Sequence, residues 1–322
     1  MEIIAADIGG TNARFARATI DGRAAPVLGT IRKYKVSDYP SLTACWEAFV
    51  ADEDGPLPDK ACIAFATAVD ADTIKLTNSS WVVRPALLAR ELGLKTAHLV
   101  NDFEAISYGI SRLSLNELPL LFGKDHPLPN TGTVTILGPG TGLGVAMLVF
   151  DQGAAQIVAT EGGHLDFSPL DSLEDRMLVE LRERFVRVSN ERIVSGPGLN
   201  NLYSALARVG REAIVPRSDA ELWTAALDGS DRVARTALER LCMSYGAVAG
   251  DLALAQGAHT IILAGGLSQR MRDFLVGTSG FYSRFIAKGR FEHMMRDMAI
   301  RLVTHTEIGL FGAAAAFREQ EE

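Results

Sequence analysis

Asp7-Ile8-Gly9-Gly10-Thr11-Asn12 and Gly138-Pro139-Gly140-Thr141-Gly142-Leu143-Gly144 are the two stretches of sequence that decide the fold. Each lies between two apolar-rich runs, residues 3–6 and 13–20 in the first case and residues 133–137 and 145–150 in the second. A strand, a glycine turn and a second strand form a hairpin. A Rossmann start is different, because its glycines open a helix. The repeat suggests an internal duplication, which is a clue to the fold.

Both glycine turns are candidate phosphate sites. Neighbouring glycines let the backbone approach a ligand closely, and successive N–H groups form a nest for anions. Asp7, at the end of the first strand, would then hold Mg²⁺ through water. The alternative for the first stretch is a tight hairpin in which Asp7 is only a turn residue. Neither stretch contains the GxxxxGK[ST] pattern of a P-loop.

Further elements follow from hydrophobic spacing and helix-start signals. Ser172 with Asp175, and Ser218 with Glu221, have the spacing of a capping box. A polar, proline-bearing stretch at residues 116–132 places a domain boundary near residue 110. We expect strands at 61–66, 97–100 and 260–264, and helices at 41–52, 85–92, 103–111, 172–188, 230–256 and 308–318.

Three more segments carry groups suited to chemistry. Asn101-Asp102 ends a predicted strand, where an aspartate is either a general base or the N-cap of the next helix. Glu161-Gly162-Gly163-His164-x-Asp166, with Glu191 further on, offers acceptors for sugar hydroxyls; a metal site and a purely structural His164 are the alternatives. Gly265-Gly266, after a strand, suits close contact with adenine or ribose.

Composition narrows the class of protein. The 322 residues are 48% hydrophobic with a formal charge of −7, typical of a soluble globular enzyme and unfavourable for non-specific nucleic-acid binding. No apolar run reaches the ~18 residues of a membrane span. The three cysteines form no CxxC pair, so neither a disulfide framework nor structural zinc is indicated. With an acidic residue at position 2 and no targeting signal, we expect a cytoplasmic protein.

Taken together, these stretches resemble the bacterial glucokinase family, in that family's order and over almost the whole chain. DxGGT alone would indicate only the wider actin-like ATPase superfamily, and the cysteine-rich zinc motif of the related repressor–kinase sugar kinases is missing. The matching stretches are DIGGTNAR (7–14), LVNDF (99–103), GPGTGLG (138–144), EGGHLDF (161–167), SGPGL (195–199) and AGG (264–266).

The resemblance implies an α/β, two-domain actin-like (ribonuclease-H-like) fold, in which ATP and glucose meet in an interdomain cleft. The small domain would comprise residues 1–110, completed by a C-terminal helix at about 306–322, and the large domain residues 111–305. The implied reaction is ATP-dependent phosphorylation of glucose at its 6-hydroxyl, with Mg²⁺ as cofactor. The family also implies a homodimer.

Residue roles follow by similarity. Asp102 would be the catalytic base, and at an ordinary aspartate pKa of ~3.9 it would be ionised at pH 7. Asn101, Asp102, Glu161, His164, Glu191 and Asn78 would hold glucose. Ala6, Asp7, Ile8, Gly9, Gly10 and Thr11 would contact the ATP phosphates, as would Gly140 and Thr141, with Gly265 and Gly266 completing the nucleotide site and Asp7 holding Mg²⁺ through water.

One departure from the family pattern concerns the segment before Asn78. Thr77, Asn78 and Trp81 match, but Ala68 and Ala71 occupy the positions of a proline and a glycine. Because alanine disfavours a positive φ, we expect position 71 to avoid the left-handed conformation and the substrate to be unchanged.

Other functions remain as alternatives at this point. One is a kinase of another hexose. A second is a nucleotide-gated binding module like actin or the chaperone ATPases, which would not need the Asn101, Asp102, Glu161, His164 and Glu191 cluster. A third, a sugar-sensing regulator, is disfavoured because the sequence begins with a core strand and not with a helix-turn-helix segment.

Overall fold

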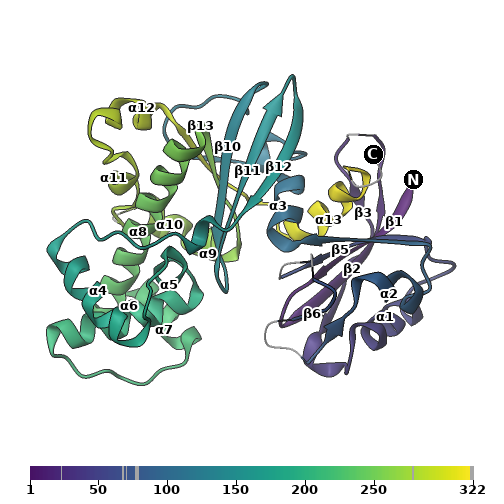
Figure 1. Cartoon of the computed structure of the whole chain (residues 1–322), viewed down its shortest axis with the longest axis horizontal. Coiled ribbons are helices and arrows are strands. Elements are labelled where there is room, and N and C mark those ends of the chain that lie inside the picture. Colours follow the sequence, from purple (N-terminus) through teal and green to yellow (C-terminus); the bar gives the residue numbers. More distant parts are fainter. Residues whose placement is uncertain (23, 67–68, 70, 77–79, 278, 320–322) are drawn as a thin grey trace. The chain divides into compact units, whose positions relative to one another are not determined.

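The computed structural model of the chain describes residues 1–319 except 23, 67–68, 70, 77–79 and 278. The chain forms two compact units (Figure 1). Unit 1 comprises Met1–Ser114 together with the C-terminal His305–Glu322, and unit 2 comprises Leu115–Thr304. Within the described part of the chain, no helix is both long and apolar enough to cross a membrane.

Unit 1 is built on a six-stranded sheet with the order β3-β2-β1-β5-β8, in which β4 also pairs with β2. The first glycine turn forms the predicted hairpin, since β1 and β2 are antiparallel, while β5 and β8 continue the sheet in parallel with β1. The strands are β1 (Glu2–Ile8), β2 (Asn12–Thr19), β3 (Val27–Leu28), β4 (Arg32–Lys35), β5 (Lys60–Phe65) and β8 (Thr96–Asn101), beside a small ribbon of β6 (Ile74–Lys75) and β7 (Val82–Val83).

The two faces of this sheet are covered by different helices, because successive strand residues point to opposite faces. On one face, Ile4, Ala6 and Ile8 of β1 pack in the cluster that holds Trp46 and Leu88 of the first two helices. On the other face, Ile3 and Ala5 pack with the third helix and the C-terminal helix. The helices are α1 (Leu42–Ala51), α2 (Pro85–Glu91), α3 (Asp102–Ile110) and α13 (Ile308–Glu319). Because Asp7 is two residues after Ala5 in β1, it lies on the same face of the sheet, which α3 and α13 cover.

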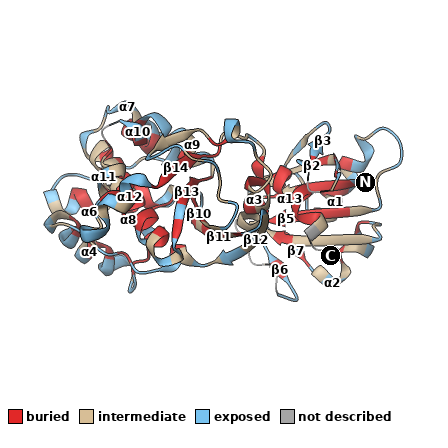
Figure 2. Cartoon of the chain, turned by 90° about the horizontal axis from the view of Figure 1, so that it is seen from above, coloured by how far each residue is buried: buried red, intermediate tan, exposed pale blue. Residues whose placement is uncertain are grey.

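The C-terminal helix α13 returns to unit 1 and lies against α3 (Figure 1). Gly109 of α3 and Gly312 of α13 permit this close approach: a Cβ at Gly312 would lie 1.8 Å from the Ala105 carbonyl oxygen. β1 and α13 are among the most deeply buried elements of unit 1 (Figure 2). The end of β1 and the start of α3 are thereby held in a tightly packed layer.

Unit 2 repeats the same plan around the second glycine turn. Its sheet has the order β12-β11-β10-β13-β14-β9, with β10 and β11 as the antiparallel hairpin and β13 and β14 parallel to β10. The order β12-β11-β10-β13-β14 corresponds strand by strand to β3-β2-β1-β5-β8 of unit 1, and β9 is an additional strand at the edge. The strands are β9 (Leu120–Phe122), β10 (Gly132–Pro139), β11 (Leu143–Asp151), β12 (Ala154–Thr160), β13 (Ala258–Leu263) and β14 (Ala299–Leu302).

The helices of unit 2 pack around the long α8, whose apolar side chains form one core with Ile261 and Leu263 of β13. Two features of the sequence prediction are wrong here. The helix predicted over residues 172–188 ends at Arg184, and its N-cap is Asp171 rather than Ser172. The helices are α4 (Ser172–Arg184), α5 (Asn190–Ile193), α6 (Gly196–Gly210), α7 (Asp219–Asp228), α8 (Arg232–Gln256), α9 (Gly266–Arg270), α10 (Arg272–Val276), α11 (Phe281–Ile286) and α12 (Glu292–Asp297).

Candidate functional site

Asp7 is the polar end of a buried strand. Its carboxylate lies 2.9 Å from Arg14 Nη1, across the β1–β2 hairpin, and Arg14 Nε lies 3.1 Å from Glu307 Oε2. Glu307 also pairs with Lys33, with 3.1 Å between the charged atoms. A Cβ at Gly309, in the first turn of α13, would lie 3.1 Å from Asp7 Oδ2. The N-terminal and C-terminal segments therefore meet at this carboxylate.

The electrostatics of Asp7 reflect its burial. Loss of solvent raises the pKa of the Asp7 carboxyl; Arg14 opposes that rise and the charge of Glu307 adds to it. An ionised Asp7 is thus only partly compensated by its protein partners. A bound cation is the kind of neighbour that would complete the compensation.

Asn101 and Asp102 have separate structural roles at the start of α3. Asn101 is the N-cap, with Oδ1 accepting hydrogen bonds from the N–H groups of Phe103 at 2.9 Å and Glu104 at 3.3 Å. Asp102 is the first residue of the helix, and its Oδ1 also accepts from the Phe103 N–H at 2.8 Å. The alternative that Asp102 serves as the N-cap is therefore wrong, because Asn101 occupies that position.

Asp102 is not an ordinary surface carboxylate. Burial, with a smaller contribution from the negative charge of Asp7, raises the pKa of Asp102 to about 6, against the lowering effect of the Phe103 N–H. The sequence-based expectation of an unperturbed pKa is therefore wrong. A carboxylate that is still ionised at pH 7 but binds a proton readily is suited to general-base catalysis.

The first glycine turn joins β1 to β2. Gly9 N–H donates to the Asn12 carbonyl oxygen at 3.0 Å, and the Thr11 carbonyl oxygen accepts from the Val36 N–H at 2.9 Å. Thr11 itself is exposed. Ala6 and Ile8 differ from the turn residues, because both are fully buried in the core beneath the turn. Their side chains are therefore not available to a ligand.

Glu161, His164 and Glu191 come together in unit 2. His164 Nε2 lies 3.9 Å from Glu161 Oε2 and 4.0 Å from Glu191 Oε1. Glu161 and Gly162–His164 follow β12 as a single 3-10 turn, whereas Glu191 belongs to α5. The Glu161 side chain is 86% exposed, so its carboxylate is open to a ligand.

The second glycine turn touches the same cluster. Glu191 Oε2 accepts a hydrogen bond from the Leu143 N–H at 3.1 Å. The Gly140 carbonyl oxygen accepts from the Gly196 N–H at 2.8 Å, at the start of α6. A predicted phosphate loop and a predicted sugar-binding carboxylate are thus connected within one unit.

Gly265 and Gly266 lie beside this turn. A Cβ at Gly138 would lie 2.5 Å from the Ala264 carbonyl oxygen, so the backbones at the ends of β10 and β13 are in direct contact. Gly265 has a φ of +83° and precedes α9, a conformation that favours glycine. Nothing lies within 4 Å of a Cβ placed at Gly140 or Gly266, so both positions are open.

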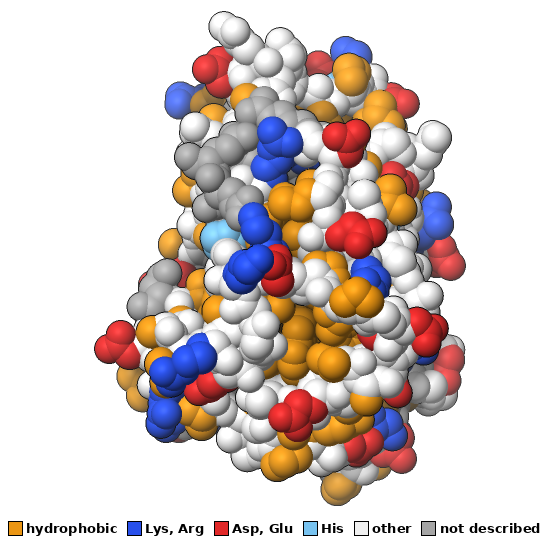
Figure 3. Space-filling model, turned by 90° about the vertical axis from the view of Figure 1, so that its right-hand side faces the viewer, with side chains coloured by type: hydrophobic (Ala, Val, Ile, Leu, Met, Phe, Trp, Pro, Cys, Tyr) orange, Lys and Arg blue, Asp and Glu red, His pale blue; other side chains and the backbone are white. Residues whose placement is uncertain are grey.

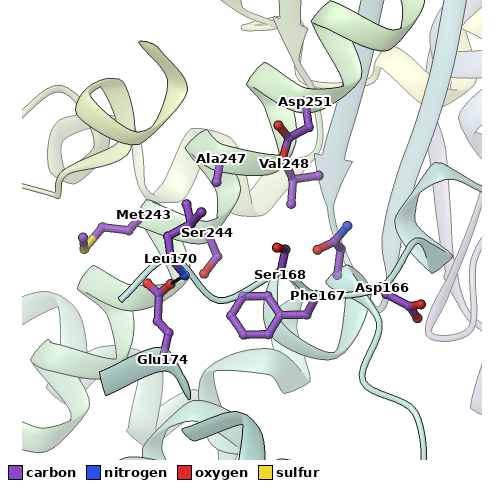
Figure 4. Close-up of a pocket in the computed structure, with 11 residues that line it drawn as sticks. Asp166, Phe167, Ser168, Leu170, Glu174, Met243, Ser244, Ala247, Val248 and Asp251 are labelled. Carbon is purple, nitrogen blue, oxygen red and sulfur yellow. Dashed lines mark hydrogen bonds between the residues drawn. The ribbon is translucent and has the colours of Figure 1, made fainter. Parts of the chain in front are cut away.

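A pocket lies behind the EGGHLDF segment, between that segment and α8 (Figure 4). It encloses about 330 Å³, part of it open to solvent. Glu174 forms one side, with Oε2 accepting from the Leu170 N–H at 2.7 Å. Its lining includes Asp166 and Asn190, which lie close in sequence to His164 and Glu191. The pocket is therefore adjacent to the cluster of Glu161, His164 and Glu191. It is lined by Asp166, Phe167, Ser168, Leu170, Glu174, Asn190, Met243, Ser244, Ala247, Val248 and Asp251.

The segment with the two alanine departures is described only in part. Ala68, Thr77 and Asn78 lie outside the described residues, so the role of Asn78 stays a prediction. Ala71 does not have a positive φ, as expected. Trp81 is buried, and its Nε1 donates to the Tyr39 carbonyl oxygen at 2.9 Å, which makes it a core residue.

Sequence reasoning missed the partners that hold these groups. No sequence motif indicated Glu307, because it lies far along the chain from Asp7 and Arg14. It contacts Arg14 because the C-terminal segment that leads into α13 packs on unit 1. Gly142 was within a quoted motif, but its contact with Glu191 depends on α5.

Charged side chains of both signs are spread over the face of the chain seen in Figure 3, with hydrophobic side chains between them. Among the described residues of this face, Lys and Arg side chains alternate with Asp and Glu side chains.

Comparison with known proteins places the chain in a family. The family model described as Glucokinase matches residues 4–320. A glucokinase of Zymomonas mobilis subsp. mobilis is 47% identical over 317 residues, which cover 98% of each chain. The solved glucokinase of an Antarctic psychrotroph is 31% identical, with a TM-score of 0.85 over 99% of each chain. A ROK family glucokinase from Streptomyces griseus, solved with glucose and AMPPNP, has a TM-score of 0.65 at 20% identity, over 99% of this chain and 100% of that one. At that identity the likeness concerns the fold alone.

Proposed function

Since the chain belongs to the glucokinase family and phosphorylates glucose, we propose that it transfers the terminal phosphoryl group of ATP to the glucose 6-hydroxyl with the residues described above. The observation that carries the residue assignment is the contact between Glu191 and the Leu143 N–H, because it joins a sugar-type cluster to a phosphate-type loop. A nucleotide-gated binding module would not need that cluster.

ATP binding is assigned to the glycine turns and the β13–α9 junction. The backbone N–H groups of Gly10, Thr11 and Thr141, which belong to exposed or partly exposed residues, are suited to phosphate oxygens. The N–H groups of Gly9 and Gly140 are engaged within their turns, so these two glycines would contribute by allowing the phosphates to approach the backbone. Gly266, where nothing lies within 4 Å of a Cβ position, leaves space for the flat adenine ring, and Gly265 lies next to it against the Pro139 carbonyl oxygen. The contribution of Ala6 and Ile8 is limited to their backbone, because their side chains are buried.

Mg²⁺ fits the chemistry of the Asp7 region. Mg²⁺ usually keeps several waters and takes one or two carboxylates together with substrate phosphates. Asp7, whose burial leaves its charge only partly compensated, is the residue that would hold the ion through water. The groups of three or more acidic, His or Cys side chains that a protein-only site would need are absent among the described residues. When bound, Mg²⁺ would supply neutralisation of phosphate charge.

Glucose recognition is assigned to Glu161, His164 and Glu191, with Asn101, Asn78 and Asp102. Carboxylates accept hydrogen bonds from sugar hydroxyls, and a neutral imidazole both donates and accepts. An acceptor that a bound sugar covers without supplying a hydroxyl partner costs ~1–3 kcal/mol, so the cluster would discriminate between hexoses once the sugar has excluded water from it.

Asp102 is assigned as the base. As the bond from the sugar 6-oxygen to the terminal phosphorus forms, the bond from that phosphorus to the ADP oxygen breaks. The hydroxyl proton passes to the Asp102 carboxylate, and ADP leaves with the electron pair of the broken bond. Positioning and charge stabilisation supply most of the catalysis in such transfers.

The test is to incubate the purified protein with ATP, Mg²⁺ and glucose, and to follow ADP and sugar phosphate separately. We expect one ADP for each glucose 6-phosphate, with the phosphorylated position identified by phosphorus and carbon NMR. ADP formation that does not depend on glucose, or a product phosphorylated at another hydroxyl, would contradict the proposal.

A homodimer and a cytoplasmic location are further proposals. The three cysteines are buried and free, which suits a reducing compartment. Light scattering coupled to size exclusion tests the dimer, and fractionation of cells that express the protein tests the location.

A further inference from the structure

We propose that Gly142 and the Leu143 N–H are positioning groups of the sugar site, which hold the Glu191 carboxylate in its binding orientation from within the phosphate loop. The inference rests on the proposed function and adds to it a residue that acts on glucose through another. It makes the sugar site sensitive to a glycine that belongs, by sequence, to the nucleotide site.

The first step is the division of labour between the two Glu191 oxygens. Oε2 accepts from the Leu143 N–H at 3.1 Å, while Oε1 is directed to the cluster side, 4.0 Å from His164 Nε2. The side chain is 28% exposed. One oxygen is therefore engaged by the loop, and the other remains available to a sugar hydroxyl. A hydrogen bond to a charged group is stronger than one between neutral groups, so this contact favours one rotamer of Glu191.

The second step is what a side chain at position 142 would displace. A Cβ at Gly142 would lie 2.2 Å from Glu191 Oε2 and 2.9 Å from its Cδ. The backbone does not demand glycine, because Gly142 is not among the described glycines with a positive φ. The requirement is space for the carboxylate. An added methyl group would therefore displace Glu191 from the Leu143 N–H.

The third step is the contrast within the same loop. Gly140 has nothing within 4 Å of its Cβ position and no positive φ, so alanine fits there. The Gly140 N–H donates to the Gly142 carbonyl oxygen at 2.8 Å, which keeps the loop compact, and alanine at position 140 retains that donor. Gly142 and Gly140 therefore form a matched pair: the same substitution, two residues apart, with and without the collision.

The experiment measures glucose affinity without nucleotide, by titration calorimetry, for the wild type, Gly142→Ala and Gly140→Ala. We expect Gly142→Ala to weaken glucose binding by about tenfold or more, as loss of a charged hydrogen bond implies. Gly140→Ala is a control for glucose affinity alone, because Gly140 is assigned to the nucleotide site and its activity with ATP is not expected to equal that of the wild type. Without nucleotide, we expect its glucose affinity to stay within about twofold of the wild type. Equal glucose affinity in Gly142→Ala and the wild type would overturn the inference.

A double-mutant cycle separates positioning from general damage to the loop. If Gly142 acts through Glu191, Gly142→Ala has no further effect on glucose affinity in a Glu191→Ala background, where the added methyl group meets no carboxylate. A full additional loss in that background would contradict the inference. Should Gly142→Ala alone not fold, recovery of folding in the double variant supports the collision, and continued misfolding overturns it.

The same data distinguish the inference from the proposed function. If the wild-type protein does not bind glucose, the proposed function itself is wrong. A wild type that binds glucose, together with a Glu191→Ala variant of unchanged affinity, removes Glu191 from the sugar site. Only the comparison of Gly142→Ala with Gly140→Ala bears on the positioning role.

Discussion

At the scale of single residues, Asp102 shows how local placement prepares a group for chemistry. It follows the N-cap Asn101, lies in a buried layer, and shares that layer with the charge of Asp7, so its pKa is raised to about 6. A sequence motif indicates which carboxylate is involved. It does not reveal the pKa, because burial depends on α13, which arrives from the other end of the chain.

Replacing Asp102 with asparagine should stabilise the folded protein while it lowers kcat by ~10²–10⁴. The raised pKa means that the native state binds the proton more tightly than the unfolded state, so stability falls as pH rises from 3.8 to about 6. Asparagine removes this cost, which is of order 3 kcal/mol above pH 6. Urea unfolding at pH 8 should show a stability gain that shrinks toward pH 4.

The control for this variant is Asp21→Asn, which alters an exposed aspartate of unit 1. Its unfolding free energy should change by less than ~0.5 kcal/mol. Asp102→Asn that is less stable than the wild type at pH 8 would show that the buried charge is compensated in the folded state.

The pH dependence of the reaction should follow the same carboxyl. Protonation of Asp102 removes the base, so kcat/KM should fall below pH 6 and reach a plateau above it. The acidic limb should be absent from the residual activity of Asp102→Asn. Initial rates between pH 5 and 8 measure this fall in kcat/KM. If Asp102→Asn shows the same fall at low pH as the wild type, another group is responsible for it.

Glu161→Gln should raise the KM for glucose strongly and leave nucleotide binding nearly intact. The side chain is 86% exposed, so the substitution should not disturb folding. Calorimetric titration with glucose and with an ATP analogue separates the two effects. Glucose affinity equal to that of the wild type would remove Glu161 from the sugar site.

At the scale of elements, hydrophobic spacing and glycine turns predicted both hairpins, while irregular glycine-rich segments left the choice between loop and helix open. The sequence 195–198, SGPG, is compatible with a loop or a helix start, and in the structure Ser195 is the N-cap of α6 and Pro197 lies in its first turn. Position 198 has no room for a side chain, since a Cβ would lie 2.2 Å from the Ile193 carbonyl oxygen. Such packing glycines resemble turn glycines in sequence, and only the tertiary contact distinguishes them.

The start of α4 illustrates the same limit. The capping box at Ser218 and Glu221 is confirmed, because both of its hydrogen bonds are local. At α4, Asp171 takes the cap instead, and its carboxylate also pairs with Arg240 and Arg284, far along the chain. The spacing of residues near Ser172 gives no information about these distant partners.

Glu174→Gln should destabilise the protein by ~1–3 kcal/mol, because it removes one of the two carboxylates, beside that of Asp171, that pair with the partly buried Arg240 and Arg284. Glu174 is 2% exposed, and its Oε1 lies 3.3 Å from Arg240 Nη1 and 3.1 Å from Arg284 Nη2. Urea unfolding measures the change, with Glu183→Gln on the exposed side of α4 as the control. A loss no larger than that of the control would show that the ion pairs contribute little.

At the scale of the whole chain, the internal repeat is the feature that sequence revealed best. The two units have the same strand order around their glycine turns, as the repeated pattern indicated. What sequence could not provide were long-range pairings, such as β9 with β14, whose partners are short and separated by most of unit 2. The division into domains as functional parts stays a prediction.

The central claim is that this chain is a kinase selective for glucose, despite Ala68 and Ala71. The most direct measurement is kcat/KM for ADP formation with glucose, mannose, galactose and fructose at saturating ATP and Mg²⁺. We expect the highest value for glucose, and little ADP without a hexose, since the groups of the Glu161, His164 and Glu191 cluster are all present. A markedly higher kcat/KM with another hexose, or hexose-independent ADP formation at a comparable rate, would contradict the account.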